Sequence, residues 1–175
     1  MSIRAAGPAD AADIAHVQVA TWRSTYRGLL PDPLLTNLSV NRREESWRAQ
    51  AEAIAKDQRL GVLLVVEEGG KVVGFASAGP ERETGSGYDA ELYAIYVLED
   101  QQGKGIGRRL VELVFAWLRE HGHGSLRVWV LEGNPAEAFY QRLGGTRVGT
   151  KQEDIGGQSV TEVAYGWVDP ETVPG

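Results

Sequence analysis

A glycine-rich segment with basic side chains carries the clearest chemical signal in the sequence. Residues 101–109 read Gln-Gln-Gly-Lys-Gly-Ile-Gly-Arg-Arg, after a strand-like run and before an apolar helical pattern. Unpaired backbone N–H groups gather where a helix begins, and the helix dipole adds partial positive charge there. Glycines let an anion approach the main chain, and Lys104, Arg108 and Arg109 add cationic charge. We therefore expect a phosphate or pyrophosphate site in this turn.

Two common phosphate-binding patterns do not fit this turn. The P-loop needs Gly-x-x-x-x-Gly-Lys followed by Ser or Thr, and no stretch of the sequence supplies it. The dinucleotide fingerprint Gly-x-Gly-x-x-Gly fits Gly103 and Gly105, but Arg108 stands where the third glycine belongs. The structural alternative is a glycine-rich helix entry that binds nothing. The mixture of glycines and cations favours an anion site.

The turn resembles that of a known family. Gln102, Gly105 and Gly107 match the pattern Q/R-x-x-G-x-G/A with which the GCN5-related N-acetyltransferases bind the pyrophosphate of acetyl-CoA. Other segments similar to that family are 22–31, 91–110, 134–145 and 165–167. The resemblance as a whole spans roughly 3–168. It implies an acyl-CoA N-acyltransferase fold, in which helices flank a mixed, mostly antiparallel α/β sheet, and an enzyme that uses acetyl-CoA.

The resemblance also implies how the cofactor is held. Its pantetheine arm would lie between two separating strands, against main-chain groups of Ile95, Tyr96 and Val97, although all three also suit a central-strand core. The residues implied at the phosphates are Gln102, Gly103, Lys104, Gly105, Ile106, Gly107 and Arg108. Asn134 would contact pantetheine, or it caps the following helix. The family commonly places this Asn seven residues before a Tyr, whereas Asn134 lies six residues before Tyr140.

Two residues are implied in catalysis. Tyr140 would act as the general acid, because a phenol with a pKa near 10 is a fair match for a departing thiolate whose thiol has a pKa near 8.5. Its alternative role is a core aromatic beside Phe139. Glu91 would act through water as the base toward the acceptor ammonium, and its alternative is a solvated charge at a strand end. The chain has no cysteine, which is consistent with direct transfer to the amine in a ternary complex.

The acceptor side is less determined by the sequence. Trp22 and Tyr26 lie four residues apart and border the acceptor site in similar proteins, or else form a helix-packing pair. Tyr93 alternates with Glu91 and Ile95, so we expect all three on one strand face, lining the acceptor pocket or the core. A small amine or a peptide N-terminus is the expected acceptor. A CoA-binding sensor without catalysis, or transfer of another acyl group, remains an alternative.

The elements that position these residues follow from periodicity and turn signals. Strands are expected over 2–5, 62–66, 71–78, 91–97, 126–131, 146–154 and 159–168. Helices are expected over 8–20, over 42–55, from the glycine turn to about 121, and from 134 to the glycines at 144–145. Asn41 with Glu44 forms a capping-box pattern at the second helix. We expect one domain over 1–169 and a short tail over 170–175.

Composition excludes several classes of protein. The chain has 175 residues, a formal net charge of −6 and no Cys, so it needs no disulfide scaffold and has no thiol nucleophile. Its three His give weak support for a metal site, and we expect none. Acidic charge disfavours nucleic acid, and we expect no membrane span and a cytoplasmic location. Dimers are common among similar proteins, and the sequence leaves a homodimer open.

Overall fold

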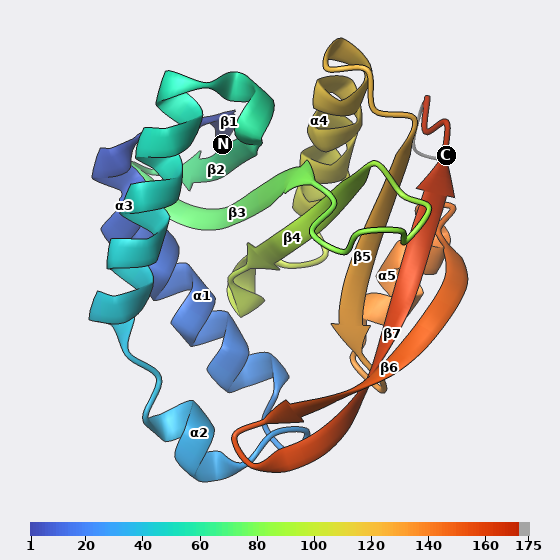
Figure 1. Ribbon diagram of the computed structural model, residues 1–175. Coiled ribbons are helices and arrows are strands. Elements are labelled where there is room, and N and C mark those ends of the chain that lie inside the picture. The colour runs from blue at the N-terminus through green and yellow to red at the C-terminus, as the bar shows by residue number, and fades with distance from the viewer. Residues whose placement is uncertain (172–175) are drawn as a thin grey trace.

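A seven-stranded sheet forms the centre of the molecule, with helices on both faces (Figure 1). The structure is a computed structural model and describes residues 1–171. The strands are β1 (Ser2–Ala5), β2 (Val62–Glu68), β3 (Lys71–Pro80), β4 (Ala90–Val97), β5 (Ser125–Leu131), β6 (Thr146–Ile155) and β7 (Gln158–Val168). The helices are α1 (Ala11–Thr25), α2 (Asp32–Thr36), α3 (Val40–Lys56), α4 (Ile106–Glu120) and α5 (Ala136–Arg142).

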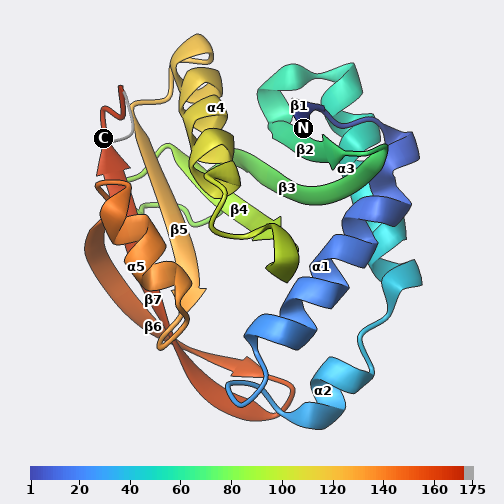
Figure 2. The same ribbon diagram turned by 180° about the vertical axis from the view of Figure 1, so that it is seen from behind.

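The order of the strands is β1-β2-β3-β4-β5-β7-β6. Neighbouring strands run antiparallel except β4 and β5, which are parallel. The predicted mixed, mostly antiparallel α/β fold is therefore confirmed. Helices α1 and α3 cover one face, and Figure 2 shows α4 and α5 on the other.

The apolar run of β2 explains why this part of the sheet has no polar face. Leu63 and Val65 pack with α1 and α3, while Leu64 and Val66 pack with α4. Because side chains alternate along a strand, a continuous apolar run buries both faces at once. Each such side chain contributes about 1.5–3 kcal/mol when it is fully buried.

Helix α3 begins earlier than predicted. Ser39, and not Asn41, is its N-cap, and the Ser39 hydroxyl accepts a hydrogen bond from the backbone N–H of Arg42 at 3.3 Å. Glu44 pairs instead with Arg48 one turn further on, so the predicted capping box is wrong. The buried positions of α3 are Trp47 and Ala51.

Two further differences from the predicted helices occur in and after α1. This helix extends to Thr25 instead of residue 20, after a 3-10 turn at Pro8–Asp10, and buries Ile14 and Val17. The five-residue helix α2 was not predicted, because it is too short for a periodic pattern. Pro33, in its first turn, provides the local signal for its start.

Strands β4 and β5 pair only at their beginnings. Their register joins Ala90 to Leu126, Glu91 to Arg127 and Leu92 to Val128, and the paired positions end there. From Tyr93 onward β4 diverges from β5, as Figure 1 shows, while β4 stays paired with β3 to Val97. The separation leaves one edge of β4 available beside β5.

A β-bulge in β4 changes which side chains share a face. Ser77 of β3 is opposite Ala94, and Ala78 is opposite Leu92, so that Tyr93 has no position of its own in the register. Ile95 therefore packs into the core with α4, whereas Tyr93 lies with Glu91 on the opposite face. The prediction that Ile95 shares a face with Tyr93 is wrong, because a bulge shifts the alternation by one residue.

The hairpin of β6 and β7 reaches across to α2. A side chain at Gly156, in the hairpin turn, would meet Leu34 of α2 at 3.2 Å, and Ile155 packs against the cluster that contains Leu35. The hairpin and the segment after α1 thus close one side of the molecule.

The end of the described chain is fixed to the domain. Asp169 N–H donates to the Gly124 carbonyl at 2.7 Å, and Arg119 donates to the carbonyls of Pro170 and Glu171. The rest of the predicted tail, residues 172–175, lies outside the described residues. Within 1–171, no helix combines the length and the apolar character that crossing a membrane requires.

Candidate active site

A cavity of about 800 Å³ lies where β4 and β5 separate. Its wall brings together segments that are far apart in the sequence, from α1, β4, the glycine turn, β5 and α5. The predicted site residues in this wall are Tyr26, Tyr93, Ile95, Tyr96, Val97, Gln102, Gly103, Gly105, Ile106, Gly107, Arg108, Asn134 and Tyr140. Trp22, Glu91 and Lys104 are not part of the wall.

The glycine turn has the geometry of an anion cradle. Gly105 is the N-cap of α4 in the left-handed region at φ 79°, and Gly103 has φ 73°. Among the described residues, no heavy atom beyond the neighbouring residues lies within 4 Å of a Cβ built on either glycine. The helix start and its N–H groups therefore face open space. At Gly107, by contrast, an added Cβ would meet the Phe139 ring at 3.0 Å, so this glycine allows α4 to pack on α5.

The polar side chains of the turn are partly engaged within the protein. The Gln102 side-chain amide donates to the Val97 carbonyl at 3.0 Å and so ties the turn to the end of β4. Lys104 Nζ donates to the Gln101 side chain at 2.8 Å. Arg108 and Arg109 both contact Glu112 on the next turn of α4. Lys104 and Arg108, which were predicted to contact phosphate, thus lie at the turn, and Lys104 is exposed.

The open edge of β4 presents main-chain groups to the cavity. Leu98 N–H donates to Val73 of β3, and Val97 accepts from Gln102 on the other side. Because main-chain groups alternate sides along a strand, those of Val97 and Ile95 face β5, and those of Tyr96 face β3. Tyr96 therefore contributes its side chain to the site, while Ile95 and Val97 contribute the main chain.

Tyr140 lies on α5 with its ring in an aromatic cluster. It is 5% exposed, and its ring centroid lies 5.3 Å from that of Phe139, 6.1 Å from Tyr165 and 6.1 Å from Trp167. Burial, and after it the nearby Tyr96, raises the pKa of Tyr140 above its usual value. The phenol therefore stays protonated through the neutral range, as a general acid requires.

Asn134 has a structural role that the sequence left open. Its side-chain oxygen accepts a hydrogen bond from the Ala136 N–H at 2.9 Å, at the start of α5. The residue is buried and also lines the cavity. Asn134 thus bonds the first residue of α5, whose N-cap is Pro135.

The predicted acceptor residues form an aromatic group linked by hydrogen bonds. Trp22 Nε1 donates to the Tyr96 hydroxyl at 2.9 Å, and the rings of Trp22 and Tyr26 meet edge to face at 4.9 Å. Burial raises the pKa of Tyr26, and the charge and hydrogen bond of Tyr96 add to the effect. Trp22 thus lies behind the wall and orients Tyr96, whereas Tyr26 faces the cavity.

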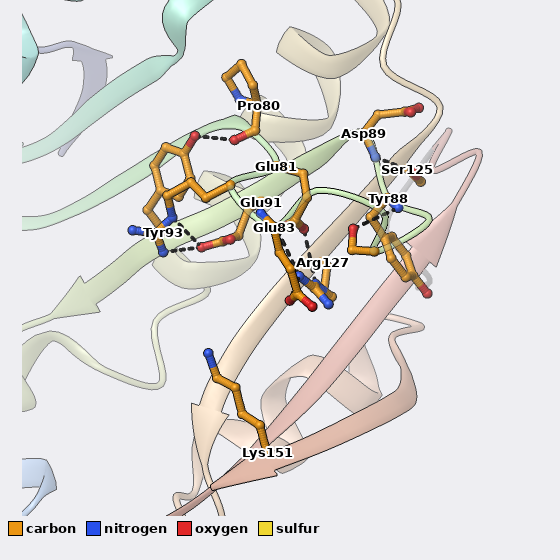
Figure 3. A network of polar contacts seen from close by, with 12 residues as sticks. Pro80, Glu81, Glu83, Tyr88, Asp89, Glu91, Tyr93, Ser125, Arg127 and Lys151 are labelled. Carbon is orange, nitrogen blue, oxygen red and sulfur yellow. Dashed lines mark hydrogen bonds and ion pairs between the residues drawn. The ribbon is translucent and has the colours of Figure 1, made fainter. Parts of the chain in front are cut away.

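Tyr93 and Glu91 share a polar network at the beginning of the separation, shown in Figure 3. The Tyr93 hydroxyl donates to the Pro80 carbonyl, and the Arg82 guanidinium lies 4.6 Å from the Tyr93 ring. Burial raises the pKa of Tyr93 to about 12, with a contribution from Glu91. The Glu91 side chain forms an ion pair with Arg82 and is 5% exposed. The interpretation of Glu91 as a solvated strand-end charge is therefore wrong.

Comparison with known proteins agrees with this geometry. The sequence model described as "Acetyltransferase (GNAT) family" matches residues 22–145. The uncharacterized N-acetyltransferase YuaI of Bacillus subtilis (strain 168) is 40% identical over 169 residues, which are 97% of this chain and 94% of YuaI. The chain belongs to the GNAT family of acetyltransferases.

Solved structures show the same architecture. Ribosomal-protein-alanine N-acetyltransferase from Brucella melitensis has 25% sequence identity and a TM-score of 0.70, over 96% of this chain and 99% of its own. The yncA protein of Salmonella typhimurium, solved with acetyl-CoA, has 22% identity and a TM-score of 0.72, over 100% of this chain and 97% of its own. From its match to the family model and to YuaI, this GNAT protein is an acetyl-CoA-dependent N-acetyltransferase.

The residues present fit acetyl-CoA. Two glycines face open space at the start of α4, main-chain groups of β4 face the gap toward β5, and Tyr140 lies in the wall of the same cavity. These features would suit the phosphate, pantetheine and thioester portions of the molecule. The thioester would supply the activated acetyl group, and these residues would hold the cofactor.

Three residues of this GNAT site were missed by sequence reasoning. Trp129 lines the cavity from β5, and Glu81 and Arg127 belong to the network around Glu91. The only signal in the sequence was the charged run after β3. This run has no periodicity from which the direction of its side chains could be predicted. Within the described residues, no group of three or more His, Cys, Asp and Glu is arranged to hold a metal ion. His121 and His123 stack on Trp117 instead.

Proposed function

We propose that this acetyltransferase moves the acetyl group of acetyl-CoA directly to a primary amine in a ternary complex. The observation that supports this most is that Tyr140 and the glycine turn line one continuous cavity. A phosphate at the turn and a thioester beside Tyr140 would then share one space. The absence of cysteine agrees with attack by the amine itself, without an acyl-thiol enzyme.

The protein groups would handle the protons as follows. Glu91 takes a proton from the acceptor ammonium through water, and the amine lone pair then attacks the thioester carbonyl. A carbon–nitrogen bond forms, the carbon–sulfur bond breaks, and the leaving thiolate takes the Tyr140 proton. The proton that the new amide nitrogen loses restores the phenol. A main-chain N–H at the open edge of β4 would stabilise the carbonyl oxygen.

The acceptor is proposed to be a protonated primary amine. Three carboxylates, Glu81, Glu83 and Glu91, pair with two arginines, Arg82 and Arg127, at the beginning of the separated strands, so that one negative charge is left over. Tyr26 and Tyr96 provide aromatic surface at the cavity. Carboxylates and aromatic faces both attract an ammonium group. Both small amines and peptide N-termini match this chemistry, and the relative from Brucella melitensis is described as acting on a ribosomal-protein alanine.

The test is an acceptor screen with acetyl-CoA. The protein is mixed with diamines, amino acids, amino sugars and short peptides, while thiol release is followed and products are identified by mass. We expect thiol release that depends on one class of amine, with one N-acetyl product per free CoA. Tight acetyl-CoA binding without thiol release for any amine would instead support a cofactor sensor.

A further inference from the structure

Two buried carboxylates, Glu81 and Glu91, lie on one face of the sheet. Glu91 is opposite Gly79 in the register, and Glu81 N–H donates to the Asp89 carbonyl at 3.0 Å, which continues the same ladder by two residues. Side chains two positions apart across such a ladder share a face as diagonal neighbours. The two side chains are 4% and 5% exposed, so water does little to screen one charge from the other.

One arginine distinguishes these two carboxylates. Arg127 of β5 is opposite Glu91 in the parallel register, yet its guanidinium bonds Glu81, with Nε at 3.1 Å and Nη2 at 2.8 Å. Its Nη2 also bonds Glu83 at 2.7 Å. The guanidinium lies 4.9 Å from the Trp129 ring, which helps to fix its direction.

Glu91 has a more exposed partner. Arg82, whose side chain is 68% exposed, forms its ion pair on the solvent side. Arg82 Nε and Nη2 both donate to Glu91 Oε2, but water screens this exposed guanidinium more than that of Arg127, whose side chain is 8% exposed. Figure 3 shows the resulting asymmetry, in which Glu81 and Glu83 gather on Arg127 and Glu91 lies beside them.

We propose that Glu81, held ionised by Arg127, is a positioning residue that makes Glu91 the member of this pair that takes up a proton. The inference rests on the proposed function only where it connects Glu91 to catalysis. Two adjacent buried carboxylates do not both ionise readily, so the one with the stronger cationic partner keeps its charge. The proton affinity of Glu91 is thereby raised by a residue that lies outside β4.

The directions of the pKa values agree with this arrangement. Burial raises the pKa of Glu91, Arg82 opposes that effect, and Glu81 adds to it. Burial alone would raise the pKa of Glu81, but the hydrogen bonds from Arg127 lower it below the usual value. The charged or titratable groups facing Glu91 are Glu81 and Arg82 from the segment after β3, Tyr93 from β4 and Arg127 from β5.

The decisive variant is Glu81→Gln, with Glu83→Gln as its matched control. Both bond the same arginine, but the Glu83 side chain is 59% exposed. Removing the Glu81 charge should lower the pKa of Glu91, because a neighbouring like charge is lost. Glu83→Gln should leave the pKa of Glu91 nearly unchanged, and Glu81→Asp should restore most of its wild-type value.

Carboxyl-carbon NMR titration measures this pKa directly, with the Glu81 and Glu91 signals assigned in the wild-type protein through their correlations with the backbone. In the wild-type protein Glu91 should titrate above Glu81, a comparison that needs no variant to fold. Equal titrations, or a Glu81→Gln shift no larger than that of Glu83→Gln, would overturn the proposal.

Activity is measured separately, so that the two hypotheses can fail independently. With the acceptor found by the screen, the acid limb of kcat/KM should move to lower pH in Glu81→Gln together with the NMR pKa. If the NMR pKa moves but Glu91→Gln keeps full activity, the pairing of the carboxylates stands and Glu91 is not the base. If the pKa of Glu91 is unchanged in Glu81→Gln while Glu91→Gln is inactive, Glu91 remains the candidate base and the role of Glu81 is refuted.

Discussion

Replacing Tyr140 with Phe isolates the phenol proton from the packing of the ring. The Tyr140 ring is held by its neighbours Phe139, Tyr165 and Trp167, and the variant keeps all of those ring contacts. Only the hydroxyl is lost from the cavity wall. We therefore expect a folded protein with nearly unchanged affinity for acetyl-CoA and a large loss of turnover.

The magnitude follows from the role assigned to the hydroxyl. A positioned general acid contributes about 100-fold to 10,000-fold to a rate, so kcat should fall at least about 100-fold. The Kd for acetyl-CoA, measured by calorimetry, should change less than about threefold, because the phosphates and pantetheine are held by the turn and β4. The raised pKa of Tyr140 also means that wild-type kcat should not decline as the pH approaches 10.

Tyr165 provides a matched control for this variant. It is also buried and packs 6.1 Å from Tyr140, but it lies outside the cavity wall and its hydroxyl donates to Glu137 at 2.8 Å. Tyr165→Phe should lose about 1 kcal/mol of stability and retain kcat. Equal kcat values for wild type and Tyr140→Phe would refute the role of Tyr140, and equal losses in both variants would assign the effect to packing.

Two further pairs of variants test the turn and the corrected helix start. Gly105→Ala and Gly122→Ala place Cβ on left-handed backbone with open space around it, so thermal unfolding should show a loss of about 1–2 kcal/mol in each. Only Gly105→Ala should also weaken acetyl-CoA binding in calorimetry, and equal affinities would remove the phosphate from that turn. Ser39→Ala should lose about 1 kcal/mol of stability in denaturant unfolding, because it deletes the cap of α3. Asn41→Ala should lose much less, and the reverse order would restore the capping-box prediction.

Much of the fold could be predicted from local pattern. The strands of the sheet and the helix after the glycine turn lie close to the expected positions, because apolar periodicity and glycine turns act over a few residues. The bulge at Tyr93 could not be predicted, since it depends on how β4 is paired with β3. It alone moves Ile95 to the other face.

The site was predictable where a residue acts through a local pattern. The glycine turn and Tyr140 fall in one cavity wall, as the family resemblance implied. Glu81 and Arg127 were missed because they are 46 residues apart and meet only through the parallel pairing of β4 and β5. Long-range pairing of charges leaves no periodic signal in the sequence.

The central claim is that one cavity holds CoA with its sulfur beside Tyr140, and a crystal structure with bound CoA tests it most directly. We expect the pyrophosphate on the backbone of residues 103–107 and pantetheine along the open edge of β4. The sulfur should lie within hydrogen-bond distance of the Tyr140 hydroxyl, which is about 3–4 Å for sulfur. A CoA molecule bound outside this cavity, or a sulfur directed away from Tyr140, would contradict it.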